Sequence, residues 1–135
     1  MPAVDPAAAH VTILLAEDDD SVRTILVRVL TSHGYRVLEA SRAADAIALW
    51  TSHDGPNGGV DLLVTDVVMP GASGRELVTE LRAQCPSLPV LFTSGYFEDA
   101  PEGNADASIT QFLEKPFATA KLMQVVRQLL ANREG

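Results

Sequence analysis

Five short runs of apolar residues alternate along the chain with segments whose apolar residues recur at helical spacing, and this alternation limits the fold more than any other feature. The runs are apolar at nearly every position, which is typical of strands buried on both faces. They predict strands at 11–16, 35–39, 60–65, 90–93 and 109–113. The helical spacing predicts helices at 21–30, 43–50, 73–83 and 118–131. This order predicts an α/β domain with one parallel sheet covered by helices on both faces.

Turns and helix ends can also be assigned from residue type. Asp20 and Ser73 are of the types that cap helix N-termini, and Gly34 stands where the first helix is expected to stop. The stretch HDGPNGG at 53–59 is predicted to be a loop. Segment 97–108 contains proline, glycine and asparagine and almost no large apolar residue, so it predicts a short or mobile fourth helix, or a loop.

Length and charge exclude several classes of protein. A chain of 135 residues is long enough for one domain, which we place at 11–131, with a disordered lead-in at 1–10 and a tail at 132–135. The formal net charge of −8 argues against nonspecific binding to nucleic acid or to anionic membranes. No apolar run is long enough to span a membrane. A single cysteine, Cys85, excludes an intrachain disulfide and favours the reducing cytoplasm.

Charged and hydroxyl side chains stand where four of the predicted strands end. Glu17 and Asp18 follow the first strand, Asp66 the third, Ser94 the fourth and Lys115 the fifth. The carboxyl ends of parallel strands meet at one edge of a sheet, where ligands bind. Carboxylates crowded at such an edge repel one another unless a cation lies between them, and Mg²⁺ is the usual cation where phosphate chemistry follows. The set predicts a phosphoryl site: acids for the metal, a lysine for oxygen charge and a hydroxyl as donor.

Each of these features has an ordinary structural explanation when taken alone. An acidic run before a helix most often caps it, a lone Asp after a strand is most often a turn residue, and a Lys-Pro pair is most often part of a loop. The phosphoryl site is favoured because the strand ends together supply the separate parts of a single reaction.

From residue 11 to 131 the sequence resembles the receiver domain of two-component response regulators. The resemblance rests on four stretches, ILLAEDDDSVR at 13–23, DLLVTDVVMPGASG at 61–74, PVLFTSGY at 89–96 and FLEKPF at 112–117. It implies a flavodoxin-like, doubly wound sheet of five parallel strands in the order 2-1-3-4-5, the order known for the chemotaxis member of the family.

The resemblance also implies an acceptor and a metal site. Asp66 matches the phosphoacceptor, whose carboxylate attacks the phosphorus of a phosphohistidine on a partner kinase. Asp18 matches the acid that binds Mg²⁺ directly, and Glu17 matches a neighbour that usually reaches the metal through water. Asp66 itself and the backbone carbonyl of Val68 would complete the protein ligands.

Three further residues match the parts of the family that respond to phosphorylation. Lys115 matches the lysine that pairs with the phosphoryl oxygens, and its bond to Pro116 would be cis. Ser94 matches the switch hydroxyl that swings toward the phosphoryl group. Phe112 matches the aromatic residue that turns inward when the hydroxyl moves, and a phenylalanine there has no phenol hydroxyl to form a hydrogen bond.

The function implied is a phosphoacceptor module of a two-component phosphorelay, a signalling domain that assists its own phosphorylation. Its implied partners are a histidine kinase or a histidine phosphotransfer domain, and a downstream protein. If two copies pair, the fourth and fifth strands and the last helix form the expected interface. TSGY followed by a weak helix resembles receivers that stand alone or are attached to hybrid kinases.

Two other functions compete with this one. A receiver-like interaction domain that signals without phosphate would be favoured by the loss of the acceptor, the acid pair or the lysine, and all of these are present. A phosphohydrolase with an aspartyl nucleophile usually carries a second Asp two residues after the first. That position is Val68, which argues against this class.

Overall fold

The computed structural model describes residues 10–69, 71–95 and 108–132, and its centre is a five-stranded parallel sheet. The strands lie in the order β2-β1-β3-β4-β5, which confirms the predicted order 2-1-3-4-5. Their bounds are β1 (Thr12–Ala16), β2 (Arg36–Ala40), β3 (Leu62–Asp66), β4 (Val90–Ser94) and β5 (Thr110–Glu114).

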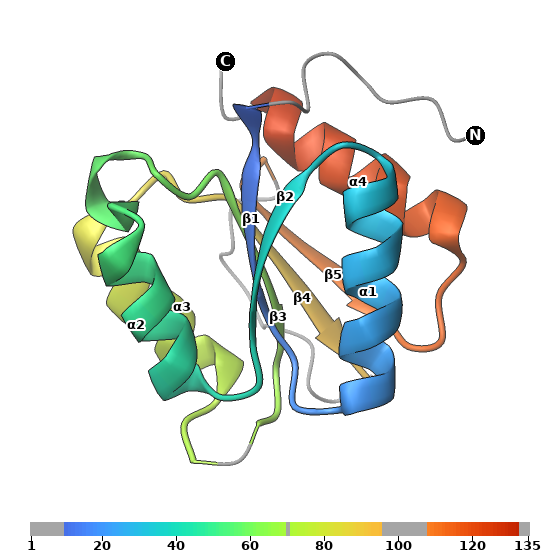
Figure 1. The fold of residues 1–135 in the computed structure, drawn as a ribbon, viewed down its shortest axis with the longest axis horizontal. Coiled ribbons are helices and arrows are strands. Elements are labelled where there is room, and N and C mark those ends of the chain that lie inside the picture. The colour runs from blue at the N-terminus through green and yellow to red at the C-terminus, as the bar shows by residue number, and fades with distance from the viewer. Residues whose placement is uncertain (1–9, 70, 96–107, 133–135) are drawn as a thin grey trace.

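Helices cover both faces of the sheet, as the sequence predicted. They are α1 (Asp20–Ser32), α2 (Ala43–Ser52), α3 (Gly74–Gln84) and α4 (Thr119–Asn132). Helices α1 and α4 lie against one face and α2 and α3 against the other (Figure 1). A short 3-10 turn, η2 (Gly55–Asn57), lies within the loop predicted at 53–59. The predicted fourth helix falls almost entirely on residues 97–107, outside the described residues, so α4 is the last helix.

Two apolar cores, one on each face of the sheet, explain why the inner strands are almost entirely apolar. Along β1, Ile13 and Leu15 pack with α1 and α4, while Leu14 and Ala16 pack with α2 and α3. Successive side chains of a strand point to opposite faces, so a strand with a core on each face is apolar at nearly every position. All residues of β1, β3 and β4 are buried.

The first helix begins one residue earlier than expected. Its N-cap is Asp19, whose side chain accepts a hydrogen bond from the backbone N–H of Val22 at 3.0 Å. The prediction that Asp20 caps this helix was therefore wrong. A capping side chain must reach a free N–H in the first turn from an extended residue outside the helix, and Asp20 is already helical. Ser73 does cap α3, in a reciprocal arrangement with Glu76.

The third strand extends to Asp66, which pairs in register with Thr93 of β4. The first residue of helix α3, Gly74, packs against this strand end. The N–H of Gly74 donates to the carbonyl of Val67 at 2.8 Å, and a Cβ on Gly74 would lie 2.0 Å from the carbonyl oxygen of Asp66. Position 74 therefore needs a glycine, because any side chain would push α3 away from the backbone that carries Asp66.

We expect Gly74→Ala to lower the free energy of unfolding by about 1–3 kcal/mol, the usual cost of overpacking. The added methyl group meets a backbone carbonyl, which cannot move aside as a flexible side chain can. Chemical denaturation would measure the change. Gly95→Ala is the matched control, because its Cβ would meet nothing within 4 Å. Equal stability of the two variants would contradict the close approach of α3 to β3.

Candidate functional site

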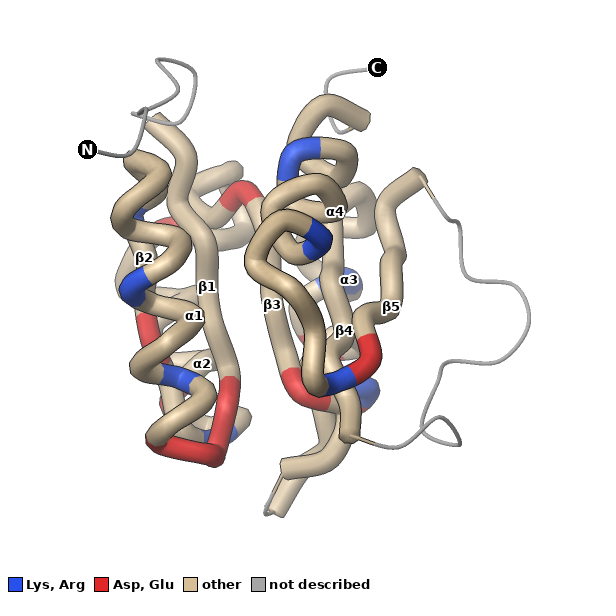
Figure 2. The backbone as a smooth tube through the Cα atoms, turned by 90° about the vertical axis from the view of Figure 1, so that its right-hand side faces the viewer, with Lys and Arg blue, Asp and Glu red and all other residues tan. Residues whose placement is uncertain are grey.

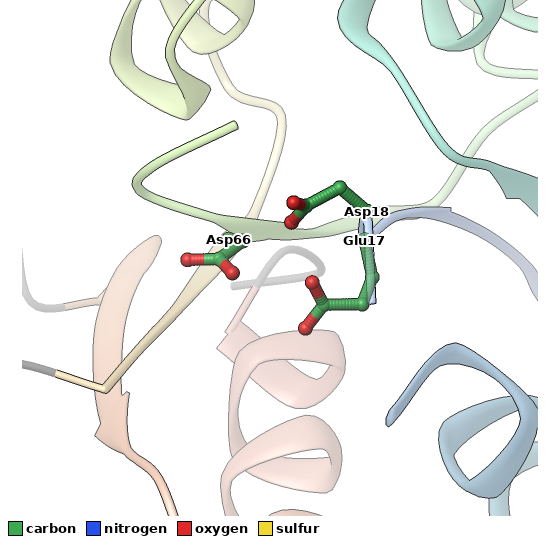
Figure 3. Close-up of side chains that lie close together, drawn as sticks. All are labelled: Glu17, Asp18 and Asp66. Carbon is green, nitrogen blue, oxygen red and sulfur yellow. The ribbon is translucent and has the colours of Figure 1, made fainter. Parts of the chain in front are cut away.

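Three carboxylates gather at the carboxyl edge of the sheet. Ala16 of β1 pairs with Thr65 of β3, so the residues that follow them, Glu17 and Asp66, come side by side. One oxygen each from Glu17, Asp18 and Asp66 lie within 4.8 Å of one another (Figure 3). Figure 2 shows the acidic ends of β1 and β3 at the same edge, together with a basic segment after β5. The structure thus brings together the acids that the sequence placed at these two strand ends.

The carboxylates differ in their exposure and in their partners. Glu17 is 1% exposed and Asp66 is 9% exposed, whereas Asp18 faces solvent. The Glu17 carboxylate accepts a hydrogen bond from the N–H of Asp19 at 3.3 Å, and Asp66 Oδ1 accepts one from the N–H of Val68 at 3.2 Å. Backbone donors therefore fix both of the buried acids, while Asp18 stays open to solvent.

Lys115 supplies the positive charge of the site. It follows β5 directly, and its backbone N–H donates to the carbonyl of Ser94 at 2.7 Å. Its Nζ donates to Glu17 Oε1 at 2.5 Å and to Asp66 Oδ2 at 2.9 Å. Strand β4 lies between β3 and β5, so the long lysine side chain is needed to reach Asp66. The Lys115–Pro116 peptide bond is cis, as the family resemblance implied.

The buried charges shift the proton affinities of the groups that carry them. Burial, helped by the negative charge of Asp66, raises the pKa of Glu17 from 4.5 to about 7, although Lys115 acts in the opposite direction. Burial alone would lower the pKa of Lys115, but its hydrogen bonds to Glu17 and Asp66 and their charges outweigh burial and raise it. Lys115 therefore stays an ammonium ion, while Glu17 takes up a proton readily near neutral pH.

The two predicted switch residues lie on the neighbouring strands. Ser94 is the last residue of β4, is 1% exposed, and pairs in register with Glu114 of β5. Phe112 of β5 pairs with Phe92 and packs, partly buried, against the core under α2 and α3. Their joint movement stays a prediction.

The donor set fits a hard divalent cation. Carboxylate oxygens are the ligands that Mg²⁺ prefers, and two strand ends supply three of them at one place. The Val68 peptide lies beside this set, because its N–H is bound to Asp66. Its carbonyl as a metal ligand stays a prediction.

One residue of this edge, Arg23, was given no role by the sequence reasoning. Its Nη1 donates to the backbone carbonyl of Glu17 at 2.9 Å. The spacing between Asp20 and Arg23 predicts a pair on the surface of a helix, and that pair is present. A contact with a backbone carbonyl has no such spacing rule, so the sequence could not reveal it.

The fold and this edge define a class of protein: an α/β domain with an acidic, lysine-bearing site at the carboxyl ends of its strands. The model of the response regulator receiver domain matches residues 13–127. The chain belongs to this family, whose members are the phosphoacceptor domains of two-component systems.

Individual relatives agree with this assignment. The chain is 42% identical over 125 residues to the sensor kinase CckA of Brucella abortus, covering 91% of this chain and 13% of that protein. It is 36% identical over 123 residues to the DNA-binding transcriptional regulator NtrC of Rhizobium meliloti, covering 90% of this chain and 24% of that protein. The chain thus spans a quarter or less of the length of these two relatives.

Solved structures match over nearly their whole length. The receiver domain from the hybrid histidine kinase CckA has a TM-score of 0.72 and 34% identity, covering 88% of this chain and 98% of that one. A response regulator receiver protein from Sinorhizobium medicae has a TM-score of 0.78 and 33% identity, covering 91% and 96%. Within residues 10–69, 71–95 and 108–132, no helix is both long and apolar enough to cross a membrane.

The raised pKa of Glu17 predicts how stability depends on pH in the metal-free protein. The folded state binds the Glu17 proton more tightly than the unfolded state, so this group contributes most to stability below pH 4.5. That contribution is lost as the pH rises toward about 7. We expect Glu17→Gln, which stays neutral, to reduce the fall in stability between pH 5 and pH 8. Chemical denaturation in EDTA would measure it.

Glu80→Gln is the control for this experiment, because it removes an exposed carboxylate from α3. It should retain the pH dependence of the original chain. A Glu17→Gln variant that loses as much stability over this range as the original chain would contradict the assignment of the proton to Glu17.

Proposed function

We propose that Asp66 accepts a phosphoryl group from a phosphohistidine of a histidine kinase or histidine phosphotransfer domain. Glu17, Asp18, Asp66 and the carbonyl of Val68 would hold the Mg²⁺ that this reaction uses. The observation that carries the proposal is the convergence of Lys115 and two further acids on the Asp66 carboxylate. A carboxylate that only ended a strand would not need a partly buried ammonium ion and a second buried acid beside it.

Asp66 is the nucleophile in this proposal. One of its oxygens attacks phosphorus while the bond between phosphorus and the imidazole nitrogen breaks, and the product is an acyl phosphate. Because Asp66 ends a strand paired to β4 and lies against the start of α3, its backbone is held in place from two directions. This rigidity supports an approach to phosphorus in one orientation.

The other residues manage charge. When bound, Mg²⁺ would offset the repulsion between the anionic donor and the acidic site. The Lys115 ammonium, now on Asp66 Oδ2, is within reach of an oxygen of the incoming phosphoryl group. Glu17 must release its proton, or its hydrogen bond to Lys115, to become a metal ligand.

Phosphorylation would then reach the surface through β4 and β5. The hydroxyl of Ser94 would turn toward the phosphoryl group and Phe112 would turn inward. The hydrogen bond from the Lys115 N–H to the Ser94 carbonyl supports coupling between the two strand ends. The face of β4, β5 and α4 is the proposed contact surface for a downstream protein and for a second copy of the chain.

The remaining sequence expectations are proposals of the same kind. The receiver domain would extend over residues 11–131, with a disordered lead-in at 1–10 and a tail at 132–135. It would act as a signalling domain in the cytoplasm. A chain with a single cysteine forms no intrachain disulfide, which is typical of proteins in that reducing compartment.

Intact mass spectrometry after incubation with a small phosphodonor and Mg²⁺ tests this function. We expect the addition of one phosphoryl group to the original chain and none in EDTA or in Asp66→Asn. Asp54→Asn is the matched control, since it makes the same change at an exposed aspartate at the start of η2. It should be phosphorylated like the original chain.

Phosphorylation of Asp66→Asn at the normal rate would overturn the proposal. So would a chain that takes up no phosphoryl group and binds neither Mg²⁺ nor beryllofluoride. That second result would favour a receiver-like domain that binds its partners without phosphate.

A further inference from the structure

Arg23 reaches from the first turn of α1 back to the end of β1. Its Nη1 donates to the backbone carbonyl of Glu17 at 2.9 Å, and its side chain is only 16% exposed. A hydrogen bond from a charged donor is stronger than one between neutral groups. This contact therefore joins the helix to the acidic turn that carries Glu17 and Asp18.

Arg23 binds the backbone carbonyl of Glu17, and the direction of this carbonyl affects how the acidic side chains of the site are placed. The N–H of Glu17 donates to Ala40 of β2 at 3.0 Å, so one side of this residue is held by the sheet. Its carbonyl belongs to the peptide bond that joins Glu17 to Asp18. The orientation of that peptide plane sets the directions in which both acidic side chains leave the backbone. The sheet thus holds the N–H of Glu17, and Arg23 holds its carbonyl.

Two further acids hold the guanidinium group in position. Arg23 Nη2 pairs with Asp20 at 2.5 Å and Nε with Glu39 at 3.4 Å. The side chains of Asp20 and Glu39 are 86% and 54% exposed, and pairs as exposed as these add little to stability. They orient the guanidinium group and offset its charge, so that Arg23 can bind the carbonyl beside a site meant for a cation.

We propose that Arg23 is a positioning residue for the Mg²⁺ site, acting through the backbone carbonyl of Glu17 and not by contact with the metal. The proposal rests on the proposed function, because it assigns the acidic turn to Mg²⁺. It explains why a cation stands close to acids that must themselves bind a cation.

The sign of one measurement separates positioning from plain electrostatics. Replacing Arg23 by a neutral residue removes a positive charge near the acids. Electrostatics alone therefore predicts tighter binding of Mg²⁺. Loss of positioning predicts weaker binding, because the acids no longer share one fixed peptide plane. Residues that orient metal ligands commonly contribute about ten-fold or more to affinity.

The test is the affinity for Mg²⁺, measured by titration calorimetry at pH 8 on the original chain, Arg23→Met and Arg23→Lys. We expect Arg23→Met to bind Mg²⁺ about ten-fold more weakly, and Arg23→Lys to fall between the two. A lysine can donate to the carbonyl but lacks the planar guanidinium fork that binds the carbonyl and both acids together. Arg28→Met, an exposed arginine further along α1, is the matched control and should bind Mg²⁺ like the original chain or slightly more tightly.

Hydrogen exchange of the Asp19 N–H in the metal-free protein gives an independent result. That N–H is bound to the Glu17 carboxylate, so it should exchange faster in Arg23→Met and not in Arg28→Met. If Arg23→Met does not fold, Arg23→Lys carries both measurements.

The outcomes distinguish this inference from the proposed function. Unchanged or tighter Mg²⁺ binding in folded Arg23 variants overturns the positioning role and leaves the proposed function intact. Lower stability with unchanged Mg²⁺ affinity also overturns it, since that result describes a purely structural arginine. An original chain that binds no Mg²⁺ overturns the proposed function, and the positioning role with it.

Discussion

The contact of the Lys115 ammonium with the carboxylates of Glu17 and Asp66 is the interaction on which the rest of the site depends. Two acids on adjacent strands, both nearly hidden from water, could not stay charged together without a cation between them. The cation is Lys115, which directly follows β5, the edge strand of the sheet next to β4. Lys115 offsets only part of the cost of burying the charge of Glu17, because burial still raises the pKa of Glu17 to about 7. The three carboxylates beside Lys115 are the group that the proposed function assigns to Mg²⁺.

Backbone contacts of the fold hold each of the three residues, Asp66, Glu17 and Lys115, in place. Asp66 is paired to β4 and lies against the first residue of α3. The N–H of Glu17 is bound to β2 and its carbonyl to Arg23. The N–H of Lys115 is bound to the carbonyl of Ser94. Since Lys115 and Ser94 share this hydrogen bond, the proposed function expects a change in what the ammonium ion contacts to move the end of β4. In the proposed function, this connection would carry the effect of a charge placed on Asp66 to the β4–β5 surface.

Much of this could be predicted from the sequence, for identifiable reasons. The strands β1, β3 and β4 are buried along their whole length because both faces of the sheet are covered. Their apolar runs therefore marked the strands, and the charged residues Glu17, Asp66 and Lys115 stood out at the strand ends. The strand order came from the resemblance to a family and not from periodicity. The errors were local: the cap of α1 is Asp19, and the choice between neighbouring aspartates depends on backbone geometry. The need for Gly74 and the contact of Arg23 could not be predicted, because both depend on backbone carbonyls, which every residue has.

The most direct test of the central claim is the location of the phosphoryl group. Borohydride reduces an acyl phosphate to an alcohol, so treatment of the phosphorylated protein followed by peptide mass spectrometry marks the residue that carried it. The account predicts homoserine in place of Asp66 and no reduction elsewhere. Reduction at Glu17 or Asp18, or a phosphoryl group on a hydroxyl or histidine side chain that resists borohydride, would contradict the account.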